Sequence, residues 1–196
     1  VEQFRSQGIN AVNFDLLYGL PHQNLQKAEE TFSKVINLSP SRIAYFGYAH
    51  VPWFKKHMRL IDKATLPDAS LRYDLFKLGE GILHDNGYLD VGIDHFAKAD
   101  DTLIHALKNK TLRRNFQGYT TDSTDNLLGF GISSISKIND IYLQNTPDRA
   151  TYKKALEDGK SLYTKYRKID LDDKIRAQII EHIMSYMHVD IESICN

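Results

Sequence analysis

Short apolar runs and longer amphipathic stretches alternate along the first half of the chain. Residues 12–20 form an apolar run that stops at Gly19 and Pro21, and residues 43–49 form a second run. Between them, residues 25–38 carry apolar side chains at helical spacing after a capping residue, Asn24; the predicted buried stripe is Leu25, Ala28, Phe32, Val35 and Ile36. This order predicts a parallel βαβ unit with a right-handed crossover.

A second unit of the same kind follows. Asp68 or Ser70 can begin a helix that runs to Asn86 and ends at Gly87, with inward positions Leu71, Leu75, Leu78 and Ile82. Residues 88–93 then predict a third strand of the same sheet. A complete (β/α)8 barrel needs about 250 residues and eight such strands. We therefore expect an α/β fold built as a partial (β/α) barrel of parallel strands.

The stretch from residue 115 to residue 136 has a different pattern, in which glycines flank a polar turn at residues 122–126. Gly118, Gly129 and Gly131 indicate a bulge or a close approach by a ligand or another strand, so a strand–loop–strand segment is predicted. Two or three helices are expected to follow, at residues 148–157, 159–166 and 171–187. The last would carry a packing stripe of Ile175, Ile179, Ile180, Ile183 and Met187.

These patterns predict three parts. Residues 1–110 are expected to be the C-terminal portion of a barrel, residues 111–146 a mixed β extension of its sheet, and residues 147–196 a helical segment that begins a C-terminal domain. The first seven residues have the pattern of the last turns of a helix, which Gly8 would end. We therefore expect the chain to be part of a larger protein.

Composition narrows the function classes. Lys and Arg number 25, as do Asp and Glu, so the formal net charge is zero and nothing favours nucleic acid or an anionic membrane as a partner. A single cysteine, Cys195, excludes a disulfide scaffold or a cysteine-built metal site within these residues. His50, His57 and His95 match no metal-binding spacing, so no metal site is predicted. With no long apolar run or leader pattern, a cytoplasmic location is expected.

Candidate chemistry falls after the predicted strands, where parallel α/β folds bind ligands. Asp15 lies between Phe14 and Leu16, where burial is costly unless the carboxylate is hydrogen-bonded; it can accept from ribose hydroxyls or from backbone N–H groups. A small residue, Ala49, either leaves room for a flat adenine ring or simply packs. The basic residues 53–63 form either a solvated helix face or a wall for an anionic substrate.

Five motifs in this sequence resemble those of the oxygen-independent coproporphyrinogen III oxidases, a family of radical S-adenosylmethionine (SAM) enzymes. They occur in the family's order and at closely similar spacing, and together they cover nearly the whole chain. The motifs are Asp15-Leu16-Leu17-Tyr18-Gly19-Leu20-Pro21, Tyr48-Ala49-His50-x-Pro52, Gly92-x-Asp94-His95-Phe96-Ala97, Phe116-Gln117-Gly118-Tyr119-Thr120-Thr121 and Gly129-x-Gly131-x-Ser133-x-Ile135-Ser136.

The resemblance implies that Asp15, Ala49 and Ile135 line SAM sites and that Phe116 and Gln117 lie near the substrate cavity; it assigns no catalytic residue. It also implies oxidative decarboxylation of two propionates of coproporphyrinogen III in haem biosynthesis, with SAM, a [4Fe–4S] cluster and a protein electron donor. Such a cluster needs several cysteine thiolates, so its ligands are expected outside these residues, and this portion alone is expected to be inactive.

Two alternatives stay open on the sequence: a haem chaperone-like radical SAM paralogue without oxidase activity, and an inert scaffold domain. Chaperone relatives tend to carry Asn-Phe-Ala near the third strand, where this chain reads Asp94-His95-Phe96-Ala97. They also tend to carry Gly-Ala-x-Ala-His later, where this chain reads Gly131-Ile132-Ser133-Ser134-Ile135. These two positions favour the oxidase.

Overall fold

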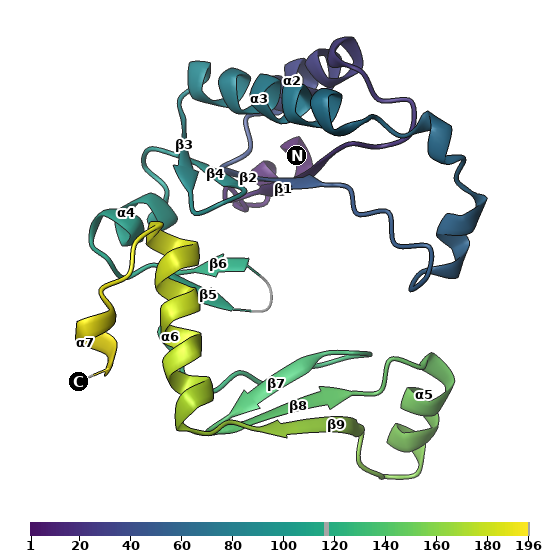
Figure 1. The fold of residues 1–196 in the computed structure, drawn as a ribbon, viewed down its shortest axis with the longest axis vertical. Coiled ribbons are helices and arrows are strands. Elements are labelled where there is room, and N and C mark those ends of the chain that lie inside the picture. The colour runs from purple at the N-terminus through teal and green to yellow at the C-terminus, as the bar shows by residue number, and fades with distance from the viewer. Residues whose placement is uncertain (116–117, 196) are drawn as a thin grey trace. The chain divides into compact units, whose positions relative to one another are not determined.

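The computed structural model describes residues 1–115 and 118–195, which form two compact units, Val1–Thr111 and Leu112–Asn196. The elements of the first unit (Figure 1) are α1 (Glu2–Ser6), β1 (Asn13–Tyr18), α2 (Leu25–Leu38), β2 (Arg42–Gly47), the 3-10 helices η1 (Lys56–Leu60) and η2 (Lys63–Thr65), α3 (Ala69–Asp85), β3 (Tyr88–Val91), β4 (His95–Lys98) and α4 (Thr102–Lys108). Those of the second are β5 (Arg113–Asn115), β6 (Gly118–Thr120), β7 (Ile135–Ile138), β8 (Ile141–Asn145), α5 (Arg149–Glu157), β9 (Tyr163–Lys168), α6 (Leu171–Tyr186) and α7 (Ile191–Cys195).

The first unit contains a four-stranded mixed sheet in the order β1-β2-β4-β3. The predicted βαβ unit is present, because β1 and β2 pair in parallel and α2 connects them. The expected continuation as a partial parallel barrel is not confirmed. After β3 the chain turns at Gly92, whose φ is 63°, and β4 inserts antiparallel between β2 and β3. The four-residue strand β4 was missed because His-Phe-Ala-Lys is too short to show a period.

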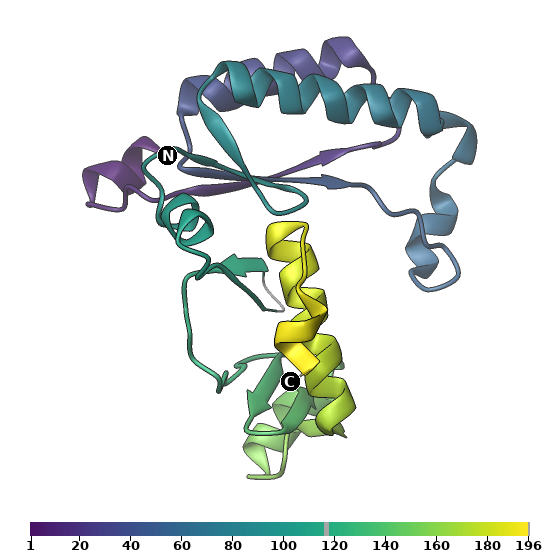
Figure 2. The ribbon, with the colours of Figure 1, turned by 60° about the vertical axis from the view of Figure 1, so that its left-hand side comes forward.

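Helices α2 and α3 pack side by side and cover one face of this sheet (Figures 1 and 2). Both begin as the sequence predicts: the side chain of Asn24 accepts from the N–H of Lys27, and that of Asp68 accepts from the N–H of Leu71. The core beneath them is buried and largely aromatic, and consists of Phe32, Val35, Ile43, Tyr45, Leu83, Tyr88 and Phe96. Packing against α2 and α3 therefore holds in place the strand side chains that face these helices.

Gly79 allows α3 to approach the aromatic core closely. A Cβ atom at this position would lie 2.4 Å from Cε1 of Tyr45 and 2.6 Å from Cζ of Phe32. The rings of Phe32 and Tyr45 meet edge to face, with centroids 5.1 Å apart, and the Tyr45 hydroxyl donates to the carbonyl of Leu75. The absence of a side chain at Gly79 thus sets the distance between helix and sheet.

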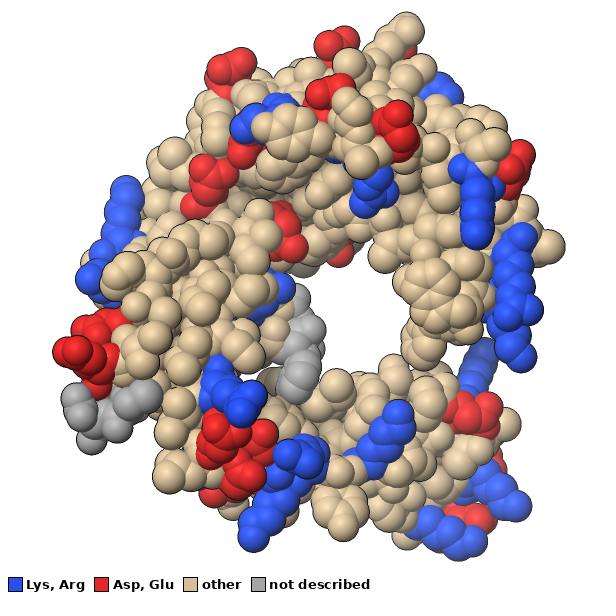
Figure 3. Space-filling view, in the orientation of Figure 1, with Lys and Arg blue, Asp and Glu red and all other residues tan. Residues whose placement is uncertain are grey.

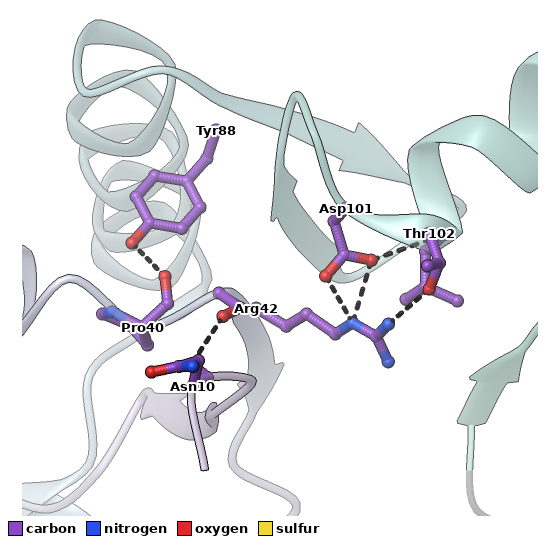
Figure 4. Close-up of polar contacts among 8 residues, drawn as sticks. Asn10, Pro40, Arg42, Tyr88, Asp101 and Thr102 are labelled. Carbon is purple, nitrogen blue, oxygen red and sulfur yellow. Dashed lines mark hydrogen bonds and ion pairs between the residues drawn. The ribbon is translucent and has the colours of Figure 1, made fainter. Parts of the chain in front are cut away.

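Polar contacts fix the beginning of β2 (Figure 4). Nε of Arg42 lies 2.8 Å from Oδ2 of Asp101, and Nη2 of Arg42 donates to the Thr102 hydroxyl. Asp101 also accepts from the N–H of Leu103 and so caps α4. The Tyr88 hydroxyl donates to the carbonyl of Pro40, which ties β3 to a point two residues before β2.

The second unit has a hairpin, β5-β6, and a three-stranded antiparallel sheet in the order β7-β8-β9. The helix expected over residues 159–166 is wrong, because Tyr163–Lys168 forms the strand β9. Its residues are all exposed, so no apolar period distinguished it, and its tyrosines and threonine favour a strand. Helix α6 forms as predicted, with a capping box at Asp170 and Asp173.

The packing stripe expected on α6 is only partly buried. Ile180 is 59% exposed, Ile183 is 45% exposed and Met187 is 59% exposed, and the only buried residue of this helix is Ser185. Periodicity therefore predicted the helix but overestimated how much of it packs within the unit. None of the helices in residues 1–115 and 118–195 combines the length and apolarity that a transmembrane segment needs.

Candidate functional site

Asp15 lies on the face of the sheet opposite α2 and α3. Phe14, Leu16 and Tyr18 alternate toward the core, so Asp15 and Leu17 point the other way. The carboxylate is exposed, and Oδ1 accepts a 2.7 Å hydrogen bond from Nδ2 of Asn13. The expected cost of burying this group between apolar neighbours is therefore absent. The alternative role, accepting from backbone N–H groups, is not seen among the described residues.

A cross-strand row joins Asp15 to β4. Asp15 pairs with Ala44 on β2, and Ala44 pairs with His95 on β4, so all three side chains share one face. Nδ1 of His95 lies 2.7 Å from Oδ1 of Asp94, and the His95 ring meets that of Phe46 edge to face at 5.6 Å. The carboxylate of Asp15 and the imidazole of His95 therefore lie on the two strands that flank β2, with the small Ala44 between them.

Ala49 follows the end of β2. The N–H of Tyr48 still donates to the carbonyl of Tyr18 at 2.7 Å, but the backbone of Ala49 makes no hydrogen bond within the described residues. Its side chain is exposed, and the Tyr48 hydroxyl lies 3.3 Å from Nδ1 of His50. An exposed small residue with free backbone groups is suited to binding the edge and face of a flat ring.

The basic segment after Ala49 is not the continuous helix considered from its pattern. It forms the 3-10 helices η1 and η2, and Trp53 is 75% exposed, Phe54 74% and Leu60 90%. The helix pattern fails here because the apolar side chains have no surface of this unit to pack against.

Ile135 opens β7 in the second unit and lines a cavity of about 810 Å³. The floor is one face of the sheet β7-β8-β9; the other walls come from β5, the turn after β6, and α6. On the β5 side, Nε of Arg113 lies 2.8 Å from Oε1 of Glu181, which also accepts from the N–H of Arg114. In the turn, hydrogen bonds from the hydroxyl and N–H of Thr124 hold the pKa of Asp122 below its usual value, so this carboxylate stays charged.

Phe116 and Gln117, which the resemblance implies lie near the substrate cavity, are outside the described part of the chain. Asp15 and Ala49 belong to the first unit and Ile135 to the second. The charged floor of the cavity was not predicted, because the residues of β9 were expected to form a helix. The strand propensity of Tyr163, Thr164 and Tyr166 was the available signal.

Comparison with known proteins gives consistent matches. The chain is 43% identical over 194 residues to the oxygen-independent coproporphyrinogen III oxidase of Cereibacter sphaeroides, covering 99% of this chain and 43% of that protein. It is 43% identical over 195 residues to the enzyme of the same name from Bradyrhizobium diazoefficiens, again covering 43% of it. No protein-family model matches.

A solved structure agrees with these sequence matches. The structure described as coproporphyrinogen III oxidase (HemN) from Escherichia coli, a radical SAM enzyme, matches with a TM-score of 0.92 and 35% identity, over 98% of this chain and 44% of that one. The chain thus spans less than half the length of the proteins it matches. Over that span, sequence and fold together confirm the resemblance of this chain to the oxygen-independent coproporphyrinogen III oxidases.

Proposed function

We propose that this chain forms part of an enzyme of the oxygen-independent coproporphyrinogen III oxidase type. Such an enzyme oxidatively decarboxylates two propionate side chains of coproporphyrinogen III to vinyl groups, giving protoporphyrinogen IX in haem biosynthesis. The observation that carries the proposal is the match in both sequence and fold over 98–99% of the chain. An electron donor protein would be a further partner.

The open face of the first unit fits a role in binding SAM. Asp15 presents an exposed carboxylate that can accept from both hydroxyls of a ribose, and Ala49 presents backbone groups that can read an adenine edge. Ile135 belongs to the second unit, and its apolar side chain would pack against the adenosine part of a SAM molecule. When bound, SAM would supply the oxidising chemistry; these residues would hold and orient it.

The iron–sulfur cluster does not fit the residues present. Cys195 is the one cysteine of the sequence, and no group of three or more His, Cys, Asp or Glu side chains in residues 1–115 and 118–195 could hold a metal. Cluster ligands would therefore come from outside these 196 residues.

The full-length protein that carries this chain provides the test. Under anaerobic conditions, with SAM, a reductant and coproporphyrinogen III, we expect protoporphyrinogen IX, measured as its porphyrin after oxidation, with two carbon dioxide molecules released per substrate. Haem binding without conversion would instead support the chaperone-like alternative. A protein that binds neither SAM nor any tetrapyrrole would support the scaffold alternative and refute the proposal.

A further inference from the structure

Two cross-strand rows place three basic residues on the cavity floor of the second unit. Lys137 of β7 and Arg167 of β9 both flank Tyr142 of β8 in one row. In the next row, Lys165 of β9 flanks Gln144, which also pairs with Ile135. Residues two apart on a strand share a face, so both rows point into the cavity; we call Lys137, Lys165 and Arg167 the cationic floor. Figure 3 shows Lys and Arg side chains over this sheet, in the lower part of the view.

Two of these three charges are not neutralised. Nη2 of Arg167 lies 3.2 Å from Oδ2 of Asp173, whereas the ammonium groups of Lys137 and Lys165 have no hydrogen bond or ion pair within the described residues. The three acidic groups of the opposite wall have contacts of their own: Glu181 and Asp125 lie close to Arg113, and Asp122 accepts from its own turn. Within the cationic floor, Lys137 and Lys165 are therefore the two charges that no acidic side chain of the described residues pairs with.

The Arg114 side chain is a second, independent feature of this cavity that favours a bound ligand. Its Nη1 atom is buried and has no hydrogen-bond partner within the described residues, although the side chain lines the same cavity. The guanidinium stacks over the Tyr119 ring, 4.5 Å from its centroid, which fixes its plane. A buried donor without an acceptor is unfavourable unless a bound group supplies that acceptor.

We infer that Lys137 and Lys165 bind two carboxylate side chains of the tetrapyrrole substrate, and that Arg114 donates to the same ligand. The inference rests on the proposed function, because it takes the ligand class from it. Two strand spacings and two residues along the strand place the Cα atoms of Lys137 and Lys165 about 12 Å apart. Propionates on different pyrrole rings of one tetrapyrrole can span such a distance, and a cavity of about 810 Å³ is in the range for a ligand of that size.

The test measures binding of coproporphyrin III, a fluorescent oxidised form of the substrate, to the full-length protein. Lys137, half-buried, should contribute more than the exposed Lys165. We expect Lys137→Gln to weaken binding about tenfold, Lys165→Gln about threefold and the double variant about thirtyfold. Lys168→Gln is the matched control, since Lys168 lies on the same strand but points away from the cavity.

The neutral tetramethyl ester of coproporphyrin III separates charge recognition from ring packing. Its affinity should be lower than that of the acid for the wild-type protein and equal among wild type and variants. Unchanged affinity of Lys137→Gln and Lys165→Gln for coproporphyrin III, with tight wild-type binding, overturns this inference and leaves the proposed function standing. Failure of the wild-type protein to bind coproporphyrin III at all overturns both.

Discussion

In the first unit the four strands and helices α2 and α3 contribute to one largely aromatic core, whereas in the second the buried apolar side chains are Leu112, Tyr119 and Ile169. The first unit covers one face of its sheet with two helices and leaves the Asp15 face without them. The second unit leaves β9 exposed along its length and carries charges on the cavity side of its sheet. Asp15 of the first unit thus lies on the sheet face that does not build the core, and the basic residues of the second unit lie on the cavity face of its sheet.

This difference separates stability from function. Changes in the core of the first unit should lower the free energy of unfolding strongly, while changes at Asp15 or on the cationic floor should alter binding and leave folding nearly unchanged. The following variants test the two halves of that statement.

The largest expected effect comes from Phe32→Ala. The Phe32 side chain is 2% exposed and packs on Tyr45, so its removal leaves a cavity and should cost about 3–5 kcal/mol of unfolding free energy. Phe130→Ala in the second unit is the control; Phe130 is 88% exposed, and the change should stay within about 0.5 kcal/mol. Urea unfolding followed by circular dichroism measures both. Equal effects would contradict the contrast between the two units.

A pair of glycines on one helix sharpens the same point. Gly79→Ala would force a methyl group against Tyr45 and Phe32 and should destabilise by about 1–3 kcal/mol. Gly81→Ala, two residues further along α3, meets no atom within 4 Å and should stabilise by about 0.5–1 kcal/mol through helix propensity. If both substitutions stabilise the protein in thermal melts, the close approach of α3 to the core is wrong.

Tyr45 predicts a pH dependence of the first unit. Burial raises the pKa of its hydroxyl above the ordinary value, and the nearby Tyr18 raises it further. Above about pH 10 the unfolded chain loses this proton while the folded chain keeps it, so stability falls as pH rises, by at most about 1.4 kcal/mol per pH unit. Denaturant melts of Tyr45→Phe between pH 8 and 11 should show a shallower fall than Tyr73→Phe, whose ring is 64% exposed. Identical slopes would count against the buried hydroxyl.

The sequence predicted structure best where packing determines it. Helix α2 matches its expected bounds to the residue, and Asn24 and Asp68 cap their helices as expected, because a buried stripe and a capping residue act locally. Prediction from the sequence failed at β4, whose antiparallel insertion depends on pairing with distant strands. It also failed at β9, because this strand has no buried face. The candidate residues came from motif resemblance; the exposure of Asp15 and the row linking it to His95 required the fold.

The central claim, that the open face of the first unit binds SAM, is tested most directly at Asp15. Calorimetric titration of SAM into the full-length, cluster-loaded protein should show that Asp15→Ala weakens binding about ten- to a hundredfold, because the ribose hydroxyls lose a charged acceptor. Asp15→Asn should fall between, and Asp74→Ala, an exposed carboxylate on α3, should bind as the wild type does. Since Asp15 is exposed, the Ala variant should fold normally by circular dichroism. A folded Asp15→Ala variant with unchanged affinity for SAM would contradict the account.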